Sequence, residues 1–299
     1  MTYKTSESKV ECVLIMPSRL DKINDYLKKL PERESVWPPL GLAYLASYLL
    51  KNGISVKIID ALALKLTPEE IITELKEDSP RFIGLNGLSN QILDVLGLSK
   101  ILKKEFLESY IILGGPHISF EHRKVINEPY VDFCVRGEGE ITFLELIQTL
   151  KKGDDLKKVK GITFKIKNKV YVNPDREFIK NLDEIPFPAW DLLPLDKYSG
   201  HIVTGRGKPF MSVLATRGCP FDCKFCSLHK LWKTQRRRSV ENVLDEIGIL
   251  YNKYGIRYLA FSDDLLVLDN EWAIELFRGM VKRGLNKIKW ECNGRIGVM

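Results

Sequence analysis

The sequence predicts an α/β protein: a doubly wound, flavodoxin-like domain with a five-stranded parallel sheet, then the first three β/α units of a TIM-type barrel. Short apolar runs alternate with amphipathic stretches over residues 11–150, as expected for right-handed βαβ crossovers in a parallel sheet. A proline-rich passage at 185–194 interrupts this alternation. The alternation then resumes from 209 to 299, with polar residues after each strand, which is where barrel enzymes place their sites.

The first domain, 10–152, is predicted to contain five strands joined by helices. The strands are expected at 13–16, 55–59, 82–85, 111–113 and 131–135, and the helices at 40–51, 67–77, 90–105, 119–127 and 140–151. Sheets of this kind bind ligands outside the carboxyl ends of their strands. The turns that follow the strands are therefore candidates for a binding site.

Four such turns are informative: the loop 17–39, which ends in Trp37-Pro38-Pro39, and the turns at 86–89, 114–117 and 136–140. Glycine at a strand-to-helix turn permits a positive φ or the close approach of a flat ligand. Turn geometry alone explains any one of them, whereas four on one rim favour a ligand site. No Gly-x-Gly-x-x-Gly follows the first strand, which argues against a dinucleotide.

Residues 153–208 are predicted to connect the domains. Residues 160–172 have the pattern of a β-hairpin with its turn at 167–169. The three prolines between 185 and 194 exclude the interior of a helix or sheet and indicate an ordered or semi-rigid connector.

The third region, 209–299, is predicted to have strands at 211–215, 258–262 and 288–292 and helices at 239–252 and 270–283. Asp263 and Asp264 follow the second strand, and Asn293 and Arg295 follow the third. The aspartates could equally be turn formers or helix caps, and Arg295 a surface charge. Because they share a rim with the loop after the first strand, we expect them to belong to one site.

That loop contains Cys219, Cys223 and Cys226, spaced Cys-x3-Cys-x2-Cys. Three thiolates suit a [4Fe–4S] cluster and leave one iron open to a non-protein ligand. Zinc is the alternative, because His229 lies three residues beyond the last cysteine. Chance clustering of buried thiols is a weaker explanation for three cysteines around a Gly-Cys-Pro turn.

The composition indicates a globular, two-domain protein, with 44% hydrophobic and 28% charged residues in 299. No apolar run is long enough to span a bilayer, and the polar N-terminus lacks the apolar core of a signal peptide. We therefore expect a cytoplasmic protein, whose reduced cysteines favour metal ligation over disulfides. The net charge of +7 is scattered, and the run 236–238 is expected to be the solvated start of a helix, so no nucleic-acid partner is predicted.

In these motifs the chain resembles the radical S-adenosylmethionine (SAM) superfamily, and more narrowly its branch with an N-terminal cobalamin-binding domain. The resemblance rests first on RGCPFDCKFC at 217–226, in which Phe225 precedes the last cysteine. Further matches are PPLGL at 38–42, GGPH at 114–117, RGEGE at 136–140 and PFPAWDLLP at 186–194. Together they cover nearly the whole chain in the expected order.

The resemblance implies that the three cysteines hold a [4Fe–4S] cluster, whose open iron is chelated by the amino and carboxylate groups of SAM. Reductive cleavage of SAM then gives a 5′-deoxyadenosyl radical. By strand order, Phe225 would lie beside the adenine, and Asp263 and Asp264 at the methionine amino group or ribose. Asn293 and Arg295 would lie near its carboxylate or ribose, where a guanidinium can pair a carboxylate bidentately.

In this family cobalamin lies between the two domains, facing the strand-end turns of the first. The residues implied in contacts with it are Ser89, Gly114, Gly115, Pro116, His117, Gly137, Glu138 and Gly139. Many cobalamin domains place a cobalt-ligating histidine after the first strand, but the loop 17–39 contains no histidine. Cobalamin is therefore expected to bind without a lower histidine ligand from this loop; the alternative is a degenerate domain that binds none.

The function that the resemblance favours is methyl transfer to an unactivated carbon of a small-molecule substrate. The alternatives are a radical SAM oxidoreductase or cyclase without methyl transfer, and a truncated, non-catalytic cofactor-binding fragment. An electron donor of the flavodoxin or ferredoxin type is implied. Family barrels continue beyond the third strand, so the chain is expected to be a gene fragment, another truncated piece, or half of a split enzyme completed by a second polypeptide.

Overall fold

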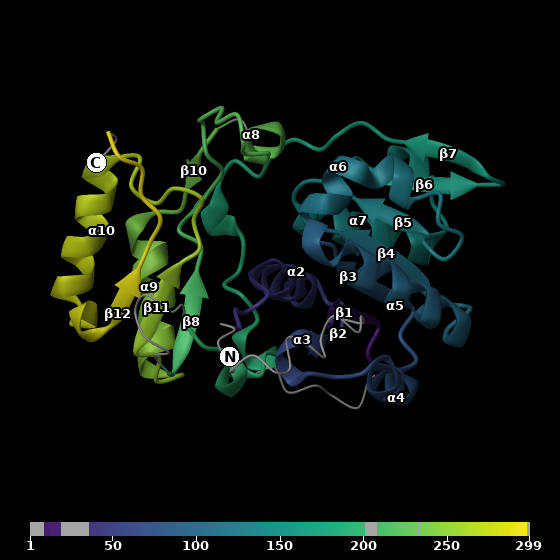
Figure 1. The fold of residues 1–299 in the computed structure, drawn as a ribbon, viewed down its shortest axis with the longest axis horizontal. Coiled ribbons are helices and arrows are strands. Elements are labelled where there is room, and N and C mark those ends of the chain that lie inside the picture. Colours follow the sequence, from purple (N-terminus) through teal and green to yellow (C-terminus); the bar gives the residue numbers. More distant parts are fainter. Residues whose placement is uncertain (1–8, 19–35, 201–207, 233, 298–299) are drawn as a thin grey trace. The chain divides into compact units, whose positions relative to one another are not determined.

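The computed structural model describes residues 9–18, 36–200, 208–232 and 234–297 (Figure 1). The chain divides into two compact units. The first is built chiefly from Gly41–Phe178 with the N-terminal strand, and the second chiefly from Pro194–Met299. Among the described residues, no helix is both long and apolar enough to cross a membrane.

The first unit contains one sheet and the helices that cover it. Its strands are β1 (Cys12–Met16), β2 (Val56–Asp60), β3 (Phe82–Asn86), β4 (Tyr110–Gly114), β5 (Phe133–Val135), β6 (Ile162–Ile166) and β7 (Lys169–Val172). Its helices are α2 (Leu40–Lys51), α3 (Ala61–Leu64), α4 (Pro68–Asp78), α5 (Ile92–Glu105), α6 (Pro116–Val125) and α7 (Gly139–Lys152). Short 3-10 turns lie at Ser89–Gln91, Leu156–Lys158 and Trp190–Leu192.

The strand order is β2-β1-β3-β4-β5-β6-β7, and the first five strands run parallel. All five residues of β1 are buried, as expected for a parallel strand covered on both faces. The predicted α/β class with five parallel strands is confirmed. Parallel pairing brings the carboxyl ends of β1, β3, β4 and β5 to one rim, where the candidate turns lie.

The hairpin β6–β7 extends this sheet, although we expected it in the connector. Strand β6 pairs antiparallel with β5, with Phe164 opposite Phe133 and Ile162 opposite Val135. All four side chains are buried, so the hairpin covers an edge that β5 would otherwise leave unpaired. The local sequence pattern predicts the hairpin. It does not predict which strand the hairpin pairs with, because that partner is distant in the sequence.

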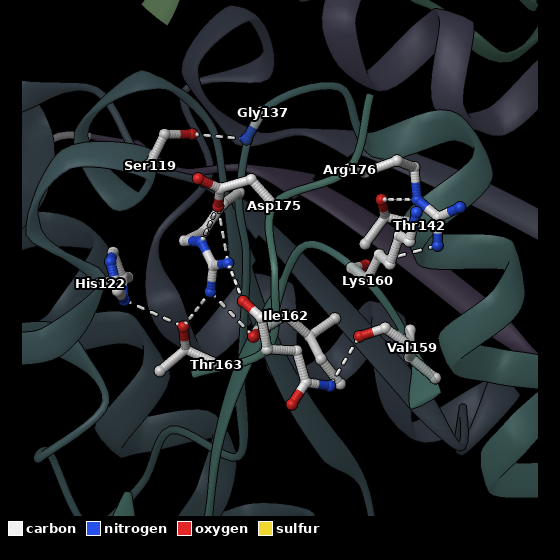
Figure 2. Close-up of polar contacts among 12 residues, drawn as sticks. Ser119, His122, Gly137, Thr142, Val159, Lys160, Ile162, Thr163, Asp175 and Arg176 are labelled. Atoms are coloured by element: carbon white, nitrogen blue, oxygen red, sulfur yellow. Dashed lines mark hydrogen bonds and ion pairs between the residues drawn. The ribbon is translucent and has the colours of Figure 1, made fainter. Parts of the chain in front are cut away.

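Arg136, directly after β5, fastens the hairpin to the sheet. Its guanidinium is buried and donates to the carbonyls of Ile162 at 2.8 Å and Asn173 at 2.6 Å, and to Thr163 Oγ1 at 2.5 Å. It also forms an ion pair with Asp175 at 2.7 Å. Figure 2 shows Ile162, Thr163 and Asp175 gathered around these contacts. The side chain of Arg136, the first residue of the RGEGE motif, therefore points into the protein interior.

Replacing Arg136 by lysine should lower the free energy of unfolding by about 2–3 kcal/mol, because one ammonium cannot supply the same fork of donors and leaves buried acceptors unpaired. The matched control is Lys160→Met, which removes an exposed ion pair with Glu177 and should change that free energy by less than about 0.5 kcal/mol. Denaturant unfolding followed by circular dichroism measures both. Equal effects would contradict the role given to Arg136.

The second unit repeats β/α units. Its strands are β8 (Phe210–Val213), β9 (Thr216–Arg217), β10 (Arg236–Arg237), β11 (Tyr258–Phe261) and β12 (Lys289–Glu291). Its helices are α8 (Leu228–Leu231), α9 (Val240–Asn252) and α10 (Asn270–Lys282), with 3-10 turns at Leu182–Glu184, Leu195–Lys197 and Leu285–Lys287. Strands β8, β11 and β12 form a parallel sheet in the order β12-β11-β8, as expected for the start of a β/α barrel.

Helices α9 and α10 each begin at a side-chain N-cap that fixes where the helix starts. Ser239 accepts the backbone N–H of Asn242, and Asp269 accepts that of Trp272. Such caps satisfy amide groups that a helix leaves without partners. Each helix returns the chain to the next parallel strand, so the ends of β8, β11 and β12 lie at one rim.

Candidate functional site

The cysteine loop, residues 218–235, lies between two short strands that close its base. Strands β9 and β10 pair antiparallel, with Arg217 opposite Arg236 and Thr216 opposite Arg237. Within the loop, the N–H of Cys226 donates to the carbonyl of Cys223 at 2.9 Å. The ladder thus brings both ends of the loop together and holds all three cysteines of the motif in one short segment.

Gly218 starts this loop with a backbone φ of +94°. A Cβ at this position would lie 2.4 Å from the carbonyl oxygen of Thr234 and 3.0 Å from Cβ of Trp232. Both the left-handed conformation and the close approach require glycine. The glycine of the RGC motif therefore lets the start of the loop pack directly against its return segment.

In the described structure none of the three cysteines of the motif forms a disulfide, and all three are half-buried. Arg295 extends from the end of β12 to this loop: its Nη1 lies 3.5 Å from Cys223 Sγ, and its guanidinium carbon 3.9 Å from the Phe221 ring centroid. Phe225 is 93% exposed, so its ring presents a flat apolar surface beside the cysteines.

Three thiol donors in a loop shaped by glycine, with a cation alongside, fit an iron–sulfur cluster by the chemistry of the donor set. Among the described residues, no three Cys, His, Asp or Glu side chains converge as the ligands of a single metal ion would. The side chain of His229, the fourth ligand in the zinc alternative, lies outside the described part of the structure. The assignment of the cysteines therefore rests on their spacing and on the shape of the loop.

The two aspartates after β11 occupy different environments. Asp263 is fully buried, and its carboxylate accepts the N–H groups of Ala215 at 3.3 Å and Thr216 at 2.5 Å. Burial raises the pKa of Asp263 to about 6. Asp264 is exposed, and Asn293 donates from its side-chain amide to the carbonyl of Asp263 at 3.1 Å. Asp263 thus contacts the segment that leads into the cysteine loop, and its carboxylate faces backbone amides there.

In the first unit, the turns after β3 and β4 interlock. The N–H of Gly87 donates to the carbonyl of Gly114 at 2.7 Å, and the N–H of His117 donates to the carbonyl of Gly87 at 3.1 Å. Ser89 Oγ lies 3.0 Å from Nδ1 of His117. Pro116 is the first residue of α6. The candidate residues of these two turns therefore form one hydrogen-bonded group.

Ser119 joins the third turn to this group, a role that the sequence did not indicate. Its hydroxyl accepts the N–H of Gly137 at 3.0 Å and donates to the carbonyl of Gly115 at 3.0 Å. Gly115 has a φ of +101°, and a Cβ there would lie 2.4 Å from Asn86 Oδ1. Gly137 has a φ of +69°, with open space where a Cβ would be.

Glu138 is the N-cap residue of α7 and Gly139 its first residue, so both belong to the turn after β5. Every predicted residue of this group therefore lies at the carboxyl ends of β3, β4 and β5. Most of the fourth candidate, the loop 17–39, lies outside the described residues.

Replacing Gly218 by alanine should open the base of the cysteine loop, because the backbone oxygen of Thr234 cannot move as a flexible side chain could. Trypsin cleavage at the exposed Lys224 should accelerate by about tenfold or more, which corresponds to about 1.4 kcal/mol of easier opening. The control is Gly255→Ala, which has a similar positive φ but open space around it. Unchanged cleavage in Gly218→Ala would contradict the proposed packing.

Two family models match the chain: the B12 binding domain over residues 30–147 and the radical SAM superfamily over residues 213–297. An uncharacterized methyltransferase, PH0819 of Pyrococcus horikoshii, is 39% identical over 92% of this chain and 61% of its own length. The anaerobic magnesium-protoporphyrin IX monomethyl ester cyclase of Cereibacter sphaeroides is 29% identical over 87% of this chain and 43% of its own length. The chain thus spans about half the length of these relatives.

Solved structures with a similar fold include the cobalamin-dependent SAM radical enzyme OxsB with aqua-cobalamin bound. It matches with a TM-score of 0.74 at 24% identity, over 92% of this chain and 37% of OxsB. The radical SAM methyltransferase TsrM of Kitasatospora setae, with cobalamin and a [4Fe–4S] cluster bound, matches with a TM-score of 0.70 at 18% identity, over 95% of this chain and 54% of TsrM. At these identities the likeness concerns the fold. The two family models, together with the cysteine motif and the likeness to PH0819, place the chain in the radical SAM superfamily, in the branch with an N-terminal B12-binding domain.

Proposed function

We propose that the chain is the cofactor-binding portion of a cobalamin-dependent radical SAM enzyme that transfers a methyl group to an unactivated carbon. The observation that carries the proposal is the cysteine loop, which has the Cys-x3-Cys-x2-Cys spacing and starts beyond the carboxyl end of β8. The same rim carries residues 263–264 and 293–295, which supply charged and polar groups for a chelating cosubstrate.

At this rim, Cys219, Cys223 and Cys226 would provide three thiolates for a [4Fe–4S] cluster, and the guanidinium of Arg295 lies beside Cys223. A cluster held there would supply the electron for the reductive cleavage of SAM to methionine and a 5′-deoxyadenosyl radical. The exposed ring of Phe225 offers a stacking surface for adenine. The part of the protein is to hold the cosubstrate in position and to keep water from it.

Near the cluster, the amino group of the SAM methionine moiety needs a protein carboxylate, and its carboxylate needs a polar or cationic side chain. Asp264 is exposed after β11 and is available for the amino group or ribose, whereas the oxygens of Asp263 already accept backbone amides. Arg295 and Asn293, at the end of β12, are suited to the carboxylate or ribose.

In the first unit, the three interlocked turns are the proposed cobalamin site. Gly137 leaves open space at the rim, and Ser89 and His117 add polar atoms beside it. The sequence of the loop 17–39 contains no histidine, so this loop supplies no histidine ligand to cobalt. The bound cobalamin supplies a carrier for the methyl group.

A radical cyclisation without methyl transfer is the second candidate function. The observation that favours it is the likeness to relatives named as monomethyl ester cyclases, at 29–31% identity over 76–87% of this chain. The methyltransferases include PH0819 and the cytidylyl-2-hydroxyethylphosphonate methyltransferase of Streptomyces wedmorensis, the latter 31% identical over 83% of this chain and 54% of its own length. Formation of S-adenosylhomocysteine separates the two functions.

The proposed partners are a small-molecule substrate and a flavodoxin- or ferredoxin-type electron donor, in the cytoplasm. A further β/α unit, from a longer chain or a second polypeptide, would complete the sheet. Among the described strands, β12 pairs only with β11. The ring of Trp290 in β12 stacks on Phe277 and is 39% exposed. A covering unit would bury this apolar surface.

Anaerobic reconstitution with iron and sulfide should give a brown protein with broad absorbance, and dithionite with SAM should release 5′-deoxyadenosine. Alanine at any cysteine of the motif should abolish the colour, because the remaining two thiolates cannot hold the cluster. The matched control is Cys292→Ala, a half-buried thiol outside the loop, which should keep the iron. A colourless wild-type protein with stoichiometric zinc would contradict the proposal.

Gly137→Ala should weaken cobalamin binding about tenfold, a loss of about 1.4 kcal/mol, because the added methyl enters the open space at the rim. Gly153→Ala is the matched control: it has a φ of +73°, also with open space, but lies at the other end of α7. Both should lose about 1 kcal/mol of stability through backbone strain. Titration of the corrin spectrum measures affinity, and equal affinities for both variants would contradict this site.

A further inference from the structure

Beyond the end of β8, the chain leaves the sheet, and its backbone N–H groups donate hydrogen bonds to a side chain. The last backbone bond there runs from the N–H of Ser262 to the carbonyl of Val213 at 2.8 Å. Beyond this bond, the N–H groups of Ala215 and Thr216 are accepted by the two carboxylate oxygens of Asp263. The Asp263 side chain therefore extends the hydrogen bonding between β8 and β11 past the point where the backbone pairing ends.

The carbonyl groups of the same stretch are bound from the other side by Arg238. Its guanidinium Nη1 donates to the carbonyl of Leu214 at 3.0 Å, and its backbone N–H donates to the carbonyl of Ala215 at 3.0 Å. The guanidinium is held in turn by the carboxylate of Glu246 and by Asn242 Oδ1. We call Asp263 and Arg238, with the strand end that they bind, the strand-end clamp.

The clamp is buried. Asp263 and Glu246 are 0% exposed and Arg238 is 5% exposed. Burying an ionised carboxylate costs free energy unless its oxygens are hydrogen-bonded, and here the bonds come from the backbone that leads into the cysteine loop. A space-filling apolar residue would avoid that cost but could not bind two amides.

The clamp acts where the direction of the loop is set. Thr216 is both an Asp263 partner and the first residue of β9, and Cys219 follows it by three residues. Gln235 at the end of the loop donates to the carbonyl of Leu265 at 2.5 Å, which ties the return segment to the same strand end. The residues after β11 thus contact both ends of the cysteine loop.

We propose that Asp263 is a positioning residue, which fixes the path of the cysteine loop through the amides of Ala215 and Thr216, and that it is not a ligand of SAM. Asp264, exposed one residue further on, is the carboxylate left for the cosubstrate. The inference rests on the proposed function in two respects only: that the loop holds a cluster and that Asp264 contacts SAM. The contact between Asp263 and the loop stands on the geometry itself.

The test compares Asp263→Asn with Asp264→Asn. An asparagine amide nitrogen donates and cannot accept a backbone N–H, so Asp263→Asn loses at least one of the two bonds. Hydrogen–deuterium exchange of the metal-free protein should show residues 214–219 exchanging at least about tenfold faster in Asp263→Asn, and at the wild-type rate in Asp264→Asn. Faster exchange across the whole second unit would contradict a role specific to the loop.

A second readout uses the reconstituted protein and the electron paramagnetic resonance spectrum of its reduced cluster. Asp263→Asn should hold less iron or show an altered cluster spectrum before SAM is added. Asp264→Asn should hold wild-type iron and show an unaltered spectrum that needs more SAM to shift. An Asp263→Asn protein with wild-type exchange, iron and spectrum but no response to SAM would overturn the proposal. A wild-type protein without iron would defeat the proposed function and leave the exchange test intact.

Discussion

The cysteine loop depends on how its base is held where β8 leaves the sheet. A strand end exposes amide and carbonyl groups that no neighbouring strand satisfies, and buried groups of this kind need partners. Here Asp263 accepts the amides and Arg238 donates to the carbonyls. With the β9–β10 pair and the close packing of Gly218, these contacts fix both ends of a loop that has little regular structure of its own.

The first unit meets the same requirement with short side chains and backbone groups. Ser119 joins the turns after β4 and β5, and His117 joins the turns after β3 and β4. Arg136 holds the hairpin against β5 from within. A rim that is bound together in this way can present glycine backbone and open space to a large, flat ligand without collapsing onto itself.

Much of this could be predicted from the sequence, because alternation and motif spacing are local properties. Helix α2 was predicted with its observed bounds, and the ends of the other main elements differ from the predicted ones by at most three residues. The partner of the β6–β7 hairpin could not be predicted, because strand pairing is non-local. The directions of Arg136, Asp263 and Asp264 were also beyond the sequence. Neighbouring residues at a strand end point to opposite sides of the sheet. Because the last three residues of β11 are all buried, the sequence does not show which of the two aspartates that follow points inward.

The central claim is that the cysteine loop holds a cluster with one iron open to SAM. Mössbauer spectroscopy of the protein reconstituted with 57Fe tests it most directly, because it resolves iron sites by their ligands. The account predicts a [4Fe–4S] spectrum in which one iron differs from the others, and the signal of that iron alone shifts when SAM is added. A spectrum that SAM leaves unchanged, or a protein that takes up no iron, would contradict it.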